Sequence, residues 1–155
     1  NDIGFFNPHA RFMPPLRSQN DRAALSTAAA RGLAAICSDH TPVGADDKLV
    51  PFGEAKPGAT GLEVLLPLTL KWAAEAGVSL SDALSRITCA PAEILGLPGG
   101  TLASGADADV CIFDPEADWQ LTPDALKSRG KNSPWLGYMM GCKVRYTLVG
   151  GRVVF

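Results

Sequence analysis

The sequence predicts an α/β protein with a parallel sheet, followed by a smaller β-rich part. Two observations lead to this prediction. A short extended segment at 10–13 and an apolar segment at 34–37 flank a helical pattern, which is the strand–helix–strand order of a βαβ unit. Beyond residue 99 the helical patterns give way to short β-rich runs. We therefore expect two parts, 1–98 and 99–155.

The composition is that of a globular chain of ordinary domain size. Its 155 residues are 46% hydrophobic and 19% charged, and the formal net charge is −2. No basic block and no apolar run of about 20 residues occurs, which argues against nucleic acid or a membrane as a partner. Four widely spaced cysteines without a C-x-x-C motif indicate reduced, buried thiols in a cytoplasmic protein, Cys37 and Cys111 among them.

The first helix is expected to begin at Ser18. This residue is a good N-cap, and Asp21 follows at capping-box spacing. An apolar stripe then recurs at helical spacing, which predicts one buried face made of Leu25, Ala28, Ala29 and Leu33. Gly32 is a suitable helix end.

A second, strongly apolar helix is expected over 62–76. Thr60 and Glu63 again have capping-box spacing at its start. Because apolar residues surround much of its girth, it should be well buried. Pro67 predicts a kink or break within it. Two shorter helices are expected over "SLSDALSRI" and "CAPAEILGL", the latter with its proline in the first turn.

The β-rich part contains one clear hairpin signal. An apolar strand is expected at 110–113, and an Asp-Pro turn follows it. Further on, "RYTLVGGRVVF" places two β-rich runs on either side of Gly150-Gly151, which is the pattern of a two-residue hairpin loop.

The most informative candidate site is Ser38-Asp39-His40, directly after an apolar segment. Two interpretations stand side by side. A parallel strand delivers acid–base groups to a pocket at its carboxyl end, which favours catalysis. Alternatively, Asp39 caps a turn and His40 begins a polar loop. The acidic pairs Asp46-Asp47 and Asp107-x-Asp109 are typical of turns, and the glycines at 58 and 61 do not form a phosphate-binding motif.

As a whole, the chain resembles the dihydroorotases of the amidohydrolase superfamily. The segments that carry the resemblance occur in the family's order: "MPPLRSQNDRAAL", "ICSDHTPV", "FGEAKPGATGLEVLLPL" and "SPWLGYMMGCKVRYTLVGGRVVF". The segment "GTLASGADADVCIFDP" is similar to the lead into the small β domain across that superfamily. The resemblance covers essentially the whole chain.

The resemblance implies the C-terminal part of a (β/α)8 TIM-type metallohydrolase barrel plus part of a small β domain. Residues 1–98 would hold barrel strands 7 and 8, at about 10–13 and 34–38, and residues 99–155 the share of the β domain. The family's two zinc ions are bound mostly by residues on earlier strands. Since the chain has only two histidines, we expect it alone to hold no binuclear zinc and to be inactive.

The resemblance also implies roles for two residues. Asp39 matches the aspartate that binds one metal, takes a proton from the bridging water and passes it to the departing amide nitrogen. Gly58 matches a glycine whose backbone touches the pyrimidine ring. The implied reaction is the reversible hydrolysis of dihydroorotate to N-carbamoyl-L-aspartate in pyrimidine biosynthesis. A homo-oligomer is the expected assembly.

Two positions depart from the family's pattern. Val43 stands where a substrate-binding histidine is usual, and Met13 stands where a substrate-binding asparagine is usual. Losing two polar contacts would cost a site for a polar ring several kcal/mol. The departures favour an alternative in which the protein is a non-catalytic structural partner of aspartate carbamoyltransferase. Hydrolysis of another cyclic amide is a third possibility.

Overall fold

The structure, a computed structural model, describes residues 5–155. Within that range it contains four α-helices, three strands and several short 3-10 helices. The residues form two compact units whose segments alternate along the chain. The first unit takes in the described residues up to Arg22, with Ser38–Leu65 and Gln120–Met139; the second takes in Ala23–Cys37, Leu66–Trp119 and Met140–Phe155.

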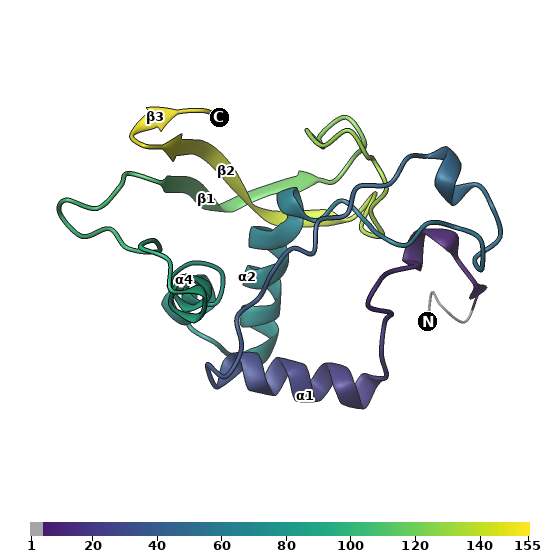
Figure 1. The fold of residues 1–155 in the computed structure, drawn as a ribbon, viewed down its shortest axis with the longest axis horizontal. Helices are drawn as coiled ribbons and strands as arrows, with labels where there is room; N and C mark the ends of the chain where they lie inside the picture. The colour runs from purple at the N-terminus through teal and green to yellow at the C-terminus, as the bar shows by residue number, and fades with distance from the viewer. Residues whose placement is uncertain (1–4) are drawn as a thin grey trace. The chain divides into compact units, whose positions relative to one another are not determined.

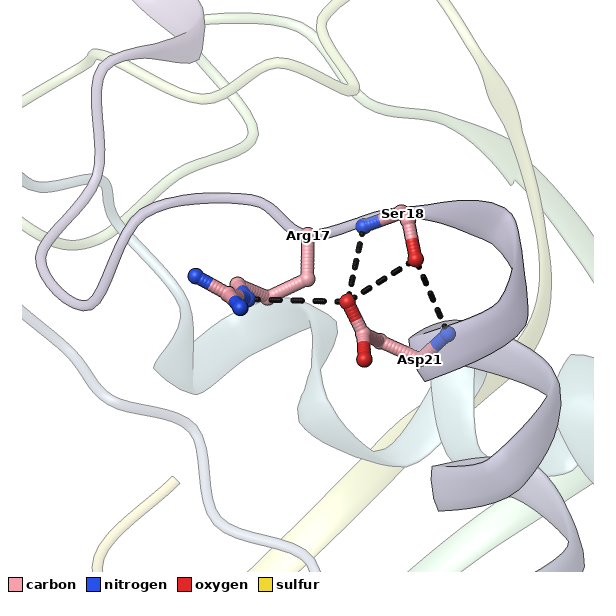
Figure 2. A network of polar contacts seen from close by, with 3 residues as sticks. All are labelled: Arg17, Ser18 and Asp21. Atoms are coloured by element: carbon pink, nitrogen blue, oxygen red, sulfur yellow. Dashed lines mark hydrogen bonds and ion pairs between the residues drawn. The ribbon is translucent and has the colours of Figure 1, made fainter.

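Helix α1 (Gln19–Ala30) begins at the predicted capping box. Ser18 Oγ accepts a hydrogen bond from the Asp21 amide at 3.2 Å, and Asp21 Oδ2 accepts one from the Ser18 amide at 3.1 Å (Figure 2). Arg17 Nε lies 3.6 Å from the same carboxylate oxygen. These bonds satisfy amides that a helix start leaves unpaired, so the predicted start is confirmed.

Only part of the apolar face predicted for the first helix is buried. Ala29 is 7% exposed, whereas Leu25 and Leu33 are 65% and 70% exposed. The side of α1 that packs is therefore the one with small residues, where Trp72 Nε1 donates a hydrogen bond to Ser26 Oγ at 2.8 Å. The prediction of one continuous buried stripe is wrong.

Helix α2 (Leu65–Ala76) follows a 3-10 turn over Leu62–Val64. The predicted capping box is wrong, because Gly61 is the N-cap of that turn and the Thr60 hydroxyl donates to a distant backbone carbonyl. Pro67 lies in the first turn of α2. There a missing amide hydrogen removes no intrahelical bond, and α2 continues unbroken from Leu65 to Ala76. The predicted helix over 62–76 instead changes from 3-10 to α just before the proline, between Val64 and Leu65.

Two short helices follow as predicted. The Ser79 side chain caps the first turn of α3 (Leu80–Ser85). Helix α4 (Cys89–Leu95) has Pro91 in its first turn and ends at Gly96, whose φ of 65° is left-handed. Glycine adopts this conformation without a Cβ clash, which explains why the helix stops there.

The strands form one small sheet near the C-terminus (Figure 1). The order is β1 (Val110–Gln120), β2 (Met139–Val149) and β3 (Arg152–Val153), and β2 pairs antiparallel with β3. The register joins the last residue of β2 to the first of β3, so Gly150 and Gly151 are a two-residue loop. Both have positive φ, as a type I′ turn requires. The predicted hairpin is confirmed.

The two parallel strands expected at 10–13 and 34–38 are not formed. A strand needs a ladder of backbone bonds to a neighbouring strand, and these segments make isolated bonds instead. The Ile36 amide donates to the Arg86 carbonyl at 2.8 Å, and the Arg11 carbonyl accepts from a loop glycine at 3.0 Å. Both segments satisfy backbone groups against loops or helix ends, so local apolar sequence did not suffice to predict the pairing.

The cysteines are free, but their predicted burial is mostly wrong. Cys37, Cys89 and Cys111 are exposed, and Cys142 alone of the four is buried. Residues 34–38 are not enclosed in a sheet, and Cys111 lies on the exposed side of its strand, so an apolar neighbourhood in sequence did not give burial. Burial, with a smaller contribution from Cys111, raises the pKa of Cys142 to about 11.

None of the helices among the described residues is both long and apolar enough to cross a membrane.

Candidate functional site

Two backbone segments of the first unit meet at the candidate site. We call residues 38–41 the Asp39 segment and residues 58–62 the glycine loop. The Thr41 amide donates to a carbonyl of the glycine loop at 3.0 Å. A Cβ added at Gly61 would come closer than 3.0 Å to the Ser38 carbonyl oxygen, a distance that real Cβ atoms essentially never show. The two segments therefore touch backbone to backbone.

Gly58 sits at the other contact between the same segments. A Cβ built there would lie 2.5 Å from the Thr41 carbonyl oxygen, and its φ of 132° is one that L side chains rarely adopt. The Gly58 amide donates to the Arg11 carbonyl at 3.0 Å. Close packing and backbone conformation are thus sufficient reasons for glycine at this position.

Asp39 is exposed and lies between two half-buried residues, Ser38 and His40. Its φ of 43° places it in the left-handed region, where few residues other than glycine are found. Aspartate tolerates this region better than most residues, and such outliers cluster at functional sites. Within residues 5–155, no hydrogen bond or ion pair engages its carboxylate, which is available for chemistry.

His40 binds the start of the helical segment that follows the glycine loop. Its Nδ1 accepts hydrogen bonds from the amides of Gly61 at 3.1 Å and Leu62 at 3.3 Å. The ring is half-buried. The prediction that His40 merely begins a polar loop does not hold, because the ring replaces the missing cap of this helical turn.

Asn132, which is distant in sequence, forms hydrogen bonds to the glycine loop. It is 5% exposed, and its Nδ2 donates to the Gly58 carbonyl at 3.1 Å. Its Oδ1 is bonded to His9 Nδ1, and its backbone carbonyl accepts from the Thr60 amide at 2.8 Å. With the Arg11 contact, both backbone polar groups of Gly58 are therefore engaged within the chain.

A buried lysine in the same unit binds the backbone of residues 8–11. Lys48 is 2% exposed, and its ammonium donates to the carbonyls of Pro8 at 3.1 Å and Arg11 at 3.2 Å. Burial lowers the pKa of Lys48, and the nearby Arg11 charge lowers it further. Arg11 itself donates to the Phe52 carbonyl at 2.7 Å. The lysine ties two chain segments together through backbone oxygens.

Glu63 joins the glycine loop's helical turn to the segment around residue 128. Its Oε1 accepts from the Lys127 amide at 3.0 Å and from the amide and hydroxyl of Ser128, each at 2.8 Å. Burial acts to raise the pKa of Glu63, but these hydrogen bonds outweigh burial and hold the pKa below its ordinary value.

The two positions that depart from the family pattern have opposite surroundings. Met13 is 68% exposed, whereas Val43 is only 5% exposed. The backbone of Gly130 lies against Val43, since a Cβ added at that glycine would be 2.8 Å from the Val43 amide nitrogen. The valine side chain fills part of the packed interior of the first unit.

The described residues do not by themselves fit a metal centre. No group of three or more histidine, cysteine, aspartate or glutamate side chains within residues 5–155 is placed to hold a metal ion. Asp39 offers one free carboxylate, while Nδ1 of His9 and Nδ1 of His40 are engaged in hydrogen bonds. The other acidic side chains of interest serve turns and ion pairs, among them Asp47 with Lys56 at 2.9 Å.

Sequence reasoning proposed Asp39 and Gly58 as site residues but did not single out the buried polar residues around them. Asn132 and Lys48 gave no signal, because an asparagine before a Ser-Pro step and a lysine after two aspartates are typical of exposed turns. The His9 ring is bonded to the Asn132 side chain, a contact that spans more than 120 positions of the chain and leaves no local pattern. Only the fold brings these distant positions together.

Comparison with known proteins places this chain in a family. Residues 5–155 match the amidohydrolase family. The dihydroorotase of Trichlorobacter lovleyi is 42% identical over 97% of this chain and 36% of its own length, and that of Syntrophotalea carbinolica is 43% identical over the same shares. The solved structure of L-hydantoinase (dihydropyrimidinase) from Arthrobacter aurescens superposes with a TM-score of 0.87 and 30% identity, over 99% of this chain and 36% of that one.

The chain thus spans a little over a third of the relatives that it matches. The family and the solved neighbours imply a TIM-barrel metallohydrolase fold, of which the described residues contribute a part. Over nearly its whole length, this chain is a dihydroorotase-like member of the amidohydrolase family.

Proposed function

We propose that this chain acts within a full-length dihydroorotase, a cyclic amidohydrolase of pyrimidine biosynthesis. The substrate would be dihydroorotate, a small cyclic amide, and the product N-carbamoyl-L-aspartate. Residues 1–98 would contribute to the barrel and residues 99–155 to the small β domain. A homo-oligomer in the cytoplasm is the proposed state. Similarity to proteins named dihydroorotase over 97% of the chain supports this proposal.

The observation that carries the proposal is the state of Asp39. Its exposed carboxylate is free of partners among the described residues. Its backbone is left-handed, and the residues on either side of it contact the glycine loop. A residue kept in a sparsely populated conformation by its surroundings is typical of a catalytic position. An aspartate that only capped a turn would use its carboxylate to bind a nearby amide.

Asp39 would move the proton in the reaction. The carboxylate accepts a proton as water attacks the ring carbonyl, and it donates that proton to the amide nitrogen as the ring bond breaks. Atoms and charge balance, because the water oxygen becomes part of the new carboxylate and one water proton passes through Asp39 to the nitrogen, which leaves as a neutral amide. The second water proton is released to solvent as the carboxylate forms. Gly58 is the proposed contact for the substrate ring. Since its amide is bonded to Arg11 and its carbonyl accepts from Asn132, the contact would use the second lone pair of the carbonyl oxygen.

Zinc is the proposed cofactor of the full-length protein. Its chemistry would be to make water acidic enough to react near neutral pH. Asp39 is the one ligand that this chain would provide, and the described residues supply no complete ligand set.

The proposed activity predicts that the purified full-length protein, supplied with zinc, interconverts dihydroorotate and N-carbamoyl-L-aspartate. We expect a kcat within the usual enzyme range of about 1–10³ s⁻¹. Ring opening is measured as the loss of dihydroorotate absorbance. Hydantoin serves as a comparison substrate in a parallel assay. Turnover of hydantoin without turnover of dihydroorotate would reassign the substrate.

A second candidate function is that of a non-catalytic partner of aspartate carbamoyltransferase. The burial of Val43 favours it, since the usual substrate-binding histidine is replaced by a side chain at 5% exposure within a packed interior. Co-elution of the two proteins in size-exclusion chromatography, together with no turnover in either direction, would support this candidate over the enzyme.

The 155-residue chain by itself is predicted to bind no pair of zinc ions. The physical reason is that residues 5–155 gather no group of three or more ligating side chains, and Asp39 alone cannot fill two sites that each need about four donors. Metal content after dialysis against zinc-containing and then metal-free buffer is the measurement. About two equivalents of zinc retained per chain would contradict the prediction.

A further inference from the structure

We propose that His40 is the positioning residue for Asp39, and that its Nδ1 performs this role. The inference rests on the proposed function, because it concerns the residue that would move the proton. His40 does not need to touch the substrate for this role. His40 is the residue directly after Asp39, and its ring accepts hydrogen bonds from the amides of Gly61 and Leu62. The contact therefore acts on Asp39 through the backbone that the two residues share.

The hydrogen bonds define which ring nitrogen is the acceptor. The amides of Gly61 and Leu62 can only donate, at 3.1 and 3.3 Å, so Nδ1 must present its lone pair. The neutral ring therefore carries its proton on Nε2. The acceptor at the δ position is the chemical feature on which the contact depends.

This contact is one of several that hold the residues on both sides of Asp39 against the glycine loop, and we call this set of contacts the bracket. The residue before it, Ser38, presses its carbonyl oxygen against Gly61, and the residue after it, His40, bonds to the amide of the same glycine. Beyond His40, the Thr41 amide donates to the carbonyl of Ala59. Asp39 is thus the exposed point of a segment fixed on both sides.

The bracket explains how Asp39 keeps its unusual backbone. A left-handed φ of 43° is unfavourable for an L residue with a side chain. If the ring contact were lost, Asp39 could relax toward negative φ and swing its carboxylate away from its present direction. A displacement of about 1 Å in a catalytic group can reduce the rate about 10²-fold.

Isosteric substitutions of His40 in the full-length protein test the proposal. In His40→Asn, Oδ1 occupies the place of Nδ1 and can accept both amides. In His40→Gln, the polar end lies near the place of Nε2 and cannot. We expect Gln to lower kcat and kcat/KM together by about 10²-fold, and Asn to retain kcat to within about tenfold. Rates are normalised to the folded fraction, so a loss of stability alone does not count.

Amide hydrogen exchange at Gly61 and Leu62 provides a readout besides activity. Protection should persist in the wild type and in His40→Asn, and should fall in His40→Gln. Equal protection in Asn and Gln, or equal kcat in the two variants, would overturn the proposal. If the wild type has no turnover and Asp39→Asn changes nothing, the proposed function fails; the exchange data then still decide whether His40 holds the loop.

Discussion

Replacing Asp39 by asparagine in the full-length protein is expected to lower kcat by about 10²- to 10⁴-fold. Asparagine keeps the shape of the side chain and tolerates the left-handed φ of 43°, so the backbone should stay in place. What is lost is a carboxylate able to accept and return a proton. Steady-state turnover of dihydroorotate, in both directions, is the measurement.

The control for Asp39→Asn is a carboxylate that the site does not use. Asp124→Asn removes an exposed carboxylate from the same unit and should leave kcat unchanged. Thermal unfolding of both variants checks that the fold persists. Equal turnover of dihydroorotate by wild type and Asp39→Asn would rule out Asp39 as the proton carrier, and a wild type without any turnover would favour the structural-partner candidate.

Replacing Gly61 by alanine is expected to destabilise the first unit by about 1–3 kcal/mol, as overpacking of a tight contact does. The new Cβ would come closer than 3.0 Å to the Ser38 carbonyl, which is backbone and cannot rotate away. Gly61 has a φ of −127°, which alanine adopts freely, so the cost is steric. The Asp39 segment would also be displaced, and we expect kcat to fall by about 10²-fold.

Gly53→Ala is the matched control for Gly61→Ala. A Cβ at Gly53 meets nothing within 4 Å, and the residue is exposed. Its free energy of unfolding should therefore change by less than about 0.5 kcal/mol. Urea unfolding of the two variants compares them directly. A Gly61→Ala variant as stable and as active as Gly53→Ala would show that the contact between the two segments is not tight in solution.

Local chemistry in the sequence was a reliable guide to the starts of two helices and to the hairpin loop. The turn expected at Asp114-Pro115 is not formed, because β1 continues through it to Gln120. Ser18 and Ser79 start helices where their side chains can bond nearby amides, and Gly150-Gly151 forms the hairpin loop that its freedom at positive φ allows. These features depend on residues close together in the chain, which is why their spacing predicts them. The same rule failed at Thr60, whose hydroxyl found a partner 70 residues away.

The sequence by itself determined the helices, the hairpin and the choice of Asp39 and Gly58 as candidate site residues. Only the tertiary structure decided that His40 holds the glycine loop, that Asn132 engages Gly58 and that Val43 is buried. It also decided that segments 10–13 and 34–38 bond to loops or helix ends instead of pairing as strands. The physical reason is that burial and long-range hydrogen bonds depend on which segments meet, and a residue's neighbours in the chain do not specify its neighbours in space.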